Sequence, residues 1–131
     1  MTSVCRLFTY LFLLLFVESL VLGFIYSTLL TGVVTGLLLL SLPLWMLYRF
    51  PSSKLTAHVV AAGCMMFSFL HIQQSYGLIE VHFEIFILMA VLIMFVEWRV
   101  FITALAFVAV HHLSFYFLQI NEMGLYVFDP D

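Results

Sequence analysis

The sequence predicts an all-α fold, a polytopic transmembrane helix bundle of about five helices in a single domain, residues 1–131. Composition is the first observation, because 66% of the residues are hydrophobic and 8% are charged, whereas soluble domains carry about 25% charged residues. The second is a mean hydropathy of +1.24. The third is that the apolar runs reach about 20 residues, the length that crosses a bilayer. The lipid bilayer is therefore the first expected partner.

Polar breaks divide the chain into five predicted helices and an acidic outer tail. The helices cover about residues 7–26, 30–48, 55–74, 79–96 and 100–119, and the tail covers residues 120–131. The first run is longer than the roughly 7–15 apolar residues of a signal peptide, and another apolar run follows it directly, so we expect a membrane helix. The turn between the first two helices must be tight.

Several residues mark the helix boundaries. The loop before the third helix contains Pro51 and two serines, which end a helix. Ser75-Tyr76-Gly77 reads as a turn. Pro43 is expected to kink the second helix. Gly32 and Gly36 have the small-xxx-small spacing of a close contact between helices.

All four basic residues indicate the same orientation in the membrane. Arg6 lies at the N-terminus, Arg49 and Lys54 in the second loop, and Arg99 in the fourth, so alternate crossings place them on one side. Basic residues are enriched on the cytoplasmic side. We therefore expect a multi-pass protein of the inner (cytoplasmic) membrane, with the N-terminus in the cytoplasm and the tail outside. So few basic residues provide no footprint for nucleic acid, and we expect none as a partner.

Ionisable side chains inside the predicted helices are the candidates for function, because membrane helices rarely keep such groups without a reason. The topology places His71, Glu80, His82 and one of His111 and His112 at a similar depth in the outer half. His112 lies about 18 Å along the fifth helix at 1.5 Å per residue. His58 lies about 20 Å below His71 on the same helix and is expected to have a separate role on the inner side.

Imidazole and carboxylate groups from different helices suit a transition metal such as copper, iron or zinc. Two histidines on neighbouring helices could instead ligate haem b as its axial ligands. The first candidates for metal binding are His71, His82, His112 and Glu80. Additional candidates are His111, His58, Glu84 and Glu18.

Each candidate also has a purely structural interpretation. A histidine in a membrane helix often only forms a hydrogen bond to a neighbouring helix. Glu80 could be favoured by a helix N-terminus, and Glu84, one turn later, could simply share its face. Glu18 near mid-membrane must pair or be protonated. His111 and His112 point about 100° apart, so only one is expected to face a common site.

Motifs in the second half of the chain occur in the order of a known pattern. His71 is followed by a turn at Gly77 and then by Ile79-Glu80-Val81-His82-Phe83. Glu97-Trp98-Arg99 resembles an Asp-Trp-Arg corner, Ala109–Phe115 an Ala-x-His-His stretch, and Gly124–Phe128 an outer tail. Over about residues 55–128 the chain resembles the N-terminal membrane-sensor module of bacterial methyl-accepting chemotaxis proteins and related histidine kinases and diguanylate cyclases.

The resemblance implies a sensory input module for signal transduction that binds its ligand through the histidines and works as a homodimer. It also implies a further helix and a cytoplasmic signalling domain after the tail, so we expect the chain to be a fragment. Three other interpretations stay open: a metal- or haem-containing membrane enzyme or electron-transfer subunit, a small transporter with a His/Glu polar path, and a structural subunit. Catalysis is disfavoured, because the sequence has no nucleotide loop, nucleophile elbow or zinc-protease motif, and no catalytic residue is assigned.

Overall fold

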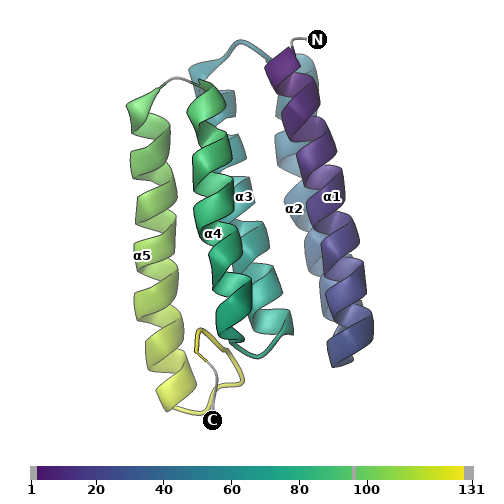
Figure 1. The fold of residues 1–131 in the computed structure, drawn as a ribbon, viewed down its shortest axis with the longest axis vertical. Helices are drawn as coiled ribbons and strands as arrows, with labels where there is room; N and C mark the ends of the chain where they lie inside the picture. The colour runs from purple at the N-terminus through teal and green to yellow at the C-terminus, as the bar shows by residue number, and fades with distance from the viewer. Residues whose placement is uncertain (1–2, 96, 129–131) are drawn as a thin grey trace.

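The chain folds into an up-and-down bundle of helices (Figure 1). We analysed a computed structural model, which describes residues 3–95 and 97–128. Its elements are α1 (Ser3–Tyr26), α2 (Leu29–Arg49), α3 (Lys54–Gln74), α4 (Ile79–Val91), the 3-10 helix η1 (Leu92–Phe95) and α5 (Trp98–Ile120). The described residues contain no strand, so the predicted all-α class is confirmed. Val96, the last residue of the predicted fourth helix, and residues 129–131 of the tail lie outside the described residues.

Helices α1, α2, α3 and α5 are each long and apolar enough to cross a membrane. The chain is therefore a membrane protein. Helix α4 has 13 residues and η1 has 4, so the predicted fourth helix changes to 3-10 geometry at Leu92. At about 1.5 Å per α-helical residue and about 2.0 Å per 3-10 residue, the two together reach about 28 Å. That length approaches the hydrocarbon thickness of about 30 Å.

The direction of the helices alternates along the chain. Figure 1 shows the N-terminus, the α2–α3 loop and the connection before α5 at one end of the bundle, with the C-terminus at the other. The four basic residues belong to the helix ends at that first end (Arg6, Arg49, Lys54 and Arg99). Helix α1 already begins at Ser3, four residues before the predicted start, because the long Arg6 side chain can reach polar surroundings from within a helix.

Helix α3 is the centre of the bundle, and it contacts α1, α2, α4 and α5. It is buried nearly all round; Val60, Cys64 and Phe67, for example, have no exposed surface. Helix α5, in contrast, is largely exposed along its length. A helix that is apolar on every face suits both surroundings, because lipid and protein interior are both apolar.

The turn between α1 and α2 contains only Ser27 and Thr28. Ser27 adopts a left-handed conformation with φ 57°, and the Thr28 N–H donates to the Gly23 carbonyl over 2.8 Å, which is the Schellman way of ending a helix. A Cβ at Gly23 would lie 2.6 Å from the Leu29 Cα. Gly23 therefore lets the chain return directly into α2, as the predicted tight turn requires.

Glycines also set how closely α1, α2 and α3 approach. An ideal Cβ at Gly32 would lie 2.8 Å from the Ser19 carbonyl oxygen and 2.5 Å from Gln74 Nε2. A Cβ at Gly36 would lie 2.7 Å from the Phe16 ring. The predicted small-xxx-small spacing thus forms a close contact between α1 and α2. This contact sets where Glu18, the neighbour of Ser19, lies in the bundle.

Candidate functional site

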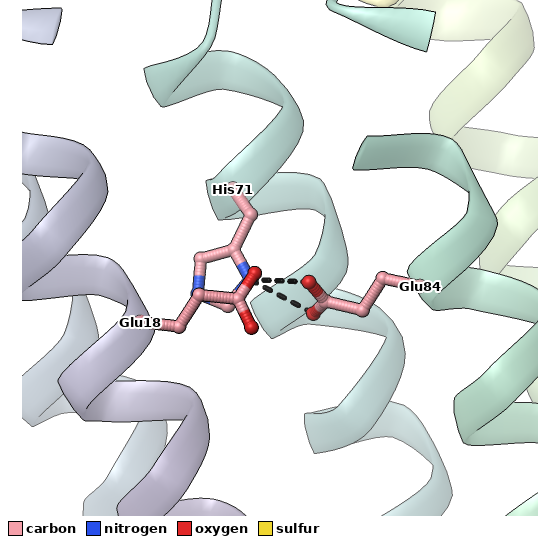
Figure 2. Close-up of side chains that lie close together, drawn as sticks. All are labelled: Glu18, His71 and Glu84. Carbon is pink, nitrogen blue, oxygen red and sulfur yellow. Dashed lines mark hydrogen bonds and ion pairs between the residues drawn. The ribbon is translucent and has the colours of Figure 1, made fainter. Parts of the chain in front are cut away.

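Three ionisable side chains from three helices converge in the bundle (Figure 2). His71 Nδ1 lies 2.8 and 3.0 Å from the two carboxylate oxygens of Glu84, and 3.1 Å from Glu18 Oε2. One ligand atom from each residue can be chosen so that all three lie within 4.8 Å of one another. We call Glu18, His71 and Glu84 the carboxylate–histidine group.

Helix geometry explains why these residues meet. His71 lies in the last turn of α3 and Glu84 in the second turn of α4, so the short turn between the helices brings both to one level. Glu18 belongs to the second half of α1, which runs toward the same end. The His71 side chain is fully buried, whereas 14% of Glu84 and 39% of Glu18 are exposed. The group is therefore accessible mainly from the side of Glu18.

The far side of the His71 ring is held by α1. His71 Nε2 lies 3.1 Å from the Leu15 carbonyl oxygen and 2.8 Å from Ser19 Oγ, and Ser19 Oγ itself donates to the Leu15 carbonyl over 3.1 Å. A carbonyl oxygen only accepts, so we assign a proton to Nε2. Nδ1 then faces the carboxylates, either as a second donor or with a free lone pair. Metal-binding histidines are commonly oriented by such a hydrogen bond from the other ring nitrogen.

The charge of the group needs compensation. Two carboxylates lie against one imidazole in a membrane-spanning bundle, where an uncompensated charge is costly. In the described part of the chain, every Lys and Arg belongs to a helix end on the opposite side of the bundle. The carboxylates must therefore share protons with His71 or receive a cation. A divalent ion would balance two carboxylates and a neutral imidazole.

A second group of histidines joins α4 and α5. The ring centres of His82 and His112 lie 5.7 Å apart. His82 Nδ1 donates to the Leu78 carbonyl over 3.2 Å and His112 Nδ1 to the Val108 carbonyl over 2.9 Å, which leaves each Nε2 with its lone pair. His82 Nε2 is buried without a hydrogen-bond partner among the described residues. When two imidazoles bind one metal ion through nitrogens about 2 Å from it, their ring centres lie at a distance similar to the 5.7 Å between His82 and His112.

The C-terminal tail lies over this pair. The Phe128 ring is 6.5 Å from the His82 ring and parallel to it, and 6.3 Å from the His112 ring. Gln119 holds the tail in place, because its Oε1 accepts from the Val127 and Phe128 N–H groups over 2.9 and 3.0 Å. Its Nε2 donates to the Phe128 carbonyl over 2.7 Å.

The remaining candidates lie elsewhere. Glu80 is exposed in the first turn of α4 and belongs to neither group. His58 Nδ1 lies 2.6 Å from Thr103 Oγ1 and links α3 to α5 near their N-terminal ends, at the opposite end of the bundle from His71. His111 stacks on Phe69 with ring centres 3.9 Å apart, and its nitrogens lack a partner among the described residues.

The structure therefore does not bring His71, His82, His112 and Glu80 into one site. It separates His71 from the pair on α4 and α5, and it replaces Glu80 with Glu84 and Glu18, which the sequence ranked as additional candidates. Sequence reasoning missed Ser19 and Ser68, which bond His71 and Glu84. The available signal was that both are small polar residues within otherwise apolar runs.

Both groups lie toward the same end of the bundle, near the ends of α3 and α5 and the start of α4. The carboxylate–histidine group can share a proton or hold a cation, and the His82–His112 pair offers two nitrogen ligands. Comparison with protein-family models, with curated proteins and with solved structures found no match to this chain.

Proposed function

We propose that this protein is a membrane-embedded sensory input module that binds a divalent transition metal through Glu18, His71 and Glu84. One observation carries the proposal: three ligand atoms from three different helices lie within 4.8 Å of one another inside a membrane bundle. The hydrogen bond from His71 Nε2 to the Leu15 carbonyl leaves Nδ1 in position to be a ligand. Two oxygen ligands and one nitrogen ligand suit iron or zinc.

A sensory role follows from which helices the ion would join. Glu18 is on α1, His71 on α3 and Glu84 on α4, so binding would cancel the repulsion between two carboxylates and draw α1 toward α4. A ligand shifts a conformational equilibrium by the difference of its affinities for the two states. Metal binding would therefore favour one packing of α1 against α4, and this change would be the signal.

The histidine pair extends the proposal. His82 and His112 each present a free Nε2, and imidazole ligands suit copper or zinc as well as haem iron. We propose that they bind a metal of their own, with haem b as the alternative ligand. The motif order from His71 to Phe128 resembles the sensor module of chemotaxis receptors, which supports the sensory role. An inner-membrane location, a cytoplasmic N-terminus and a homodimer belong to the same proposal.

The observations favour this role over a transporter. A proton or ion path needs polar groups spaced across the membrane, and His58 and His71 lie on the same helix about 20 Å apart. The α3 residues between them include Val60, Cys64 and Phe67, which are completely buried and apolar or nearly so. A polar path along α3 is therefore interrupted. Among the described residues, neither group of side chains has a further reactive side chain beside it of the kind that an enzyme would need.

Metal analysis with two matched variants tests the site. The full chain is purified into lipid nanodiscs, and bound metal is measured directly and after addition of Fe²⁺ or Zn²⁺. Glu84→Gln removes a ligand, whereas Glu80→Gln changes an exposed glutamate one turn away on the same helix. We expect Glu84→Gln to bind one equivalent of metal fewer than the natural protein, because metal on the His82–His112 pair would remain, and we expect Glu80→Gln to bind as much as the natural protein. Equal retention by the two variants, or no binding by the natural protein, contradicts the site.

A distance measurement tests the sensory part separately. Spin labels at Phe24 and Ile79, two exposed positions near the outer ends of α1 and α4, report the spacing of these helices. We expect metal to shorten or narrow the distance distribution in the natural protein and to leave Glu84→Gln unchanged. Metal that binds without altering the distribution would preserve the site and overturn the sensory mechanism.

A further inference from the structure

An apolar cavity lies between α2, α3 and α5, and none of Glu18, His71 and Glu84 lines it. Its volume is about 370 Å³, within the range of small-molecule sites. Residues from all three helices and Leu125 of the tail line it. Met66 on α3 and Val110 on α5 are exposed at its edge, so it opens toward the lipid rather than toward water. A ligand that enters it must therefore be soluble in the membrane.

His111 is the polar group that stands out in this cavity. The residue is only 4% exposed, and neither ring nitrogen has a hydrogen-bond partner among the described residues. Buried polar groups are almost always satisfied, so an orphaned imidazole needs an explanation. A neutral imidazole provides one donor and one acceptor. The missing partner is therefore a molecule with an oxygen or nitrogen atom that reaches the wall of the cavity.

The other lining residues restrict that molecule further. None of them is charged, and their only other polar groups are hydroxyls and the Gln73 amide. The Gln73 amide is already bonded to the Gly124 carbonyl and the Tyr126 N–H. A fatty acid or phosphate headgroup would thus meet no cation. Phe69, Phe107 and Phe115 supply aromatic faces, which stack favourably on a flat ring.

We propose that this cavity binds a membrane-soluble quinone or quinol, with its ring among the phenylalanines and one of its oxygens bonded to His111. The imidazole N–H would donate to a quinone carbonyl, or the bare nitrogen would accept from a quinol hydroxyl. The proposal concerns binding alone and involves no transfer of electrons. It is independent of the carboxylate–histidine group, because it uses none of the ligands Glu18, His71 and Glu84. The His111 ring does lie 5.3 Å from that of His112, a member of the histidine pair.

Photolabelling tests this binding. The full chain in nanodiscs is irradiated with a short-chain azido-quinone, and the labelled peptides are identified by mass spectrometry in the presence of increasing decylubiquinone. We expect labels on α3 and α5 around His111 that decylubiquinone removes. His111→Phe keeps a flat ring but loses both hydrogen-bonding atoms, so we expect decylubiquinone to compete about tenfold more weakly, the size of one hydrogen bond. His111→Gln, which keeps a donor and an acceptor, should recover part of that loss.

Two matched variants show whether the label reports the cavity. Val110 lines the cavity and Leu113 does not, yet 67% and 68% of these two α5 residues are exposed. Val110→Trp should abolish labelling, and Leu113→Trp should preserve it. The helical circular dichroism signal and the elution volume of each variant confirm that it is folded.

Other results would overturn the proposal. If a saturated hydrocarbon of similar length competes as well as decylubiquinone, the cavity only accommodates lipid chains. If decylubiquinone competes with the label as strongly in His111→Phe and His111→Gln as in the natural protein, His111 does not recognise the ligand. Crosslinks between two copies of α5 through the cavity, insensitive to decylubiquinone, would instead identify a second protein copy as the occupant.

Discussion

Replacing His71 with leucine should destabilise the bundle more than any other single change at the site. His71 bonds Glu84 over 2.8 Å and approaches Glu18 to 3.1 Å, and its other nitrogen bonds α1. His71→Leu leaves two carboxylates facing each other without a positive partner. Removing one member of a buried charged pair costs about 3–5 kcal/mol. We expect a loss of this size in the free energy of unfolding.

The triple replacement of Glu18, His71 and Glu84 by leucine provides the critical comparison. Exchanging a whole buried charged group for apolar side chains is often neutral or stabilising. We therefore expect the free energy of unfolding of the triple variant to lie no more than about 1 kcal/mol below that of the natural protein, and clearly above that of His71→Leu. Unfolding by denaturant in mild detergent, followed by far-ultraviolet circular dichroism with a chelator present, measures both without a contribution from metal.

His58→Leu is the matched control, because among the described residues that histidine has one side-chain bond, to Thr103 over 2.6 Å. Its loss should cost about 1 kcal/mol, the usual net value of one hydrogen bond. The reasoning is refuted if His71→Leu costs no more than His58→Leu. It is also refuted if the triple variant is as unstable as His71→Leu. The loss of stability would then come from packing and not from the unpaired carboxylates of Glu18 and Glu84.

Three further predictions concern the framework of the site. Gly32→Ala should cost about 1–3 kcal/mol of unfolding free energy, as overpacking does, because its Cβ would lie 2.8 Å from the Ser19 carbonyl oxygen; an unchanged denaturation midpoint would contradict this. Ser27→Gly should stabilise the α1–α2 turn by up to about 1 kcal/mol, since φ is 57° there and glycine adopts it freely; the same denaturation assay decides. Gln119→Ala should accelerate amide hydrogen exchange at Phe128 without altering exchange in the helices, because it removes three hydrogen bonds to the tail; unchanged exchange at Phe128 would refute it.

Helix positions could be predicted well from the sequence. Predicted ranges 30–48, 55–74 and 100–119 differ from α2, α3 and α5 by at most two residues at either end. The length of an apolar run and the position of a polar loop are local properties of the sequence. They stabilise a membrane-spanning helix wherever that helix lies in the bundle. The fourth helix was predicted less accurately, because an evenly apolar run does not indicate where α-helical geometry changes to 3-10 geometry, here at Leu92.

The composition of the site could be predicted only in part. Depth along each helix follows from residue counting, so the sequence correctly placed His71 and Glu84 toward one end of the bundle. Rotation about each helix axis does not follow from it. In water an apolar stripe would reveal the inward face, but here neither α3 nor α5 has a distinct apolar stripe, and of these two helices only α3 is largely buried. Glu80 and Glu84 were therefore indistinguishable until packing was known.

The sequence by itself determined that this chain is a helical membrane protein, how many helices it forms and at which end four of its five histidines lie. These properties depend on hydrophobic length and on the count of residues along each helix. The tertiary structure alone decided that Glu18 joins His71 and Glu84, that His82 meets His112, and that His111 turns to the cavity. The reason is physical. Close contacts such as that of Gly32 with Ser19 set the rotation of each helix about its axis. In lipid the hydrophobic pattern of a helix does not indicate which of its faces is buried in the bundle.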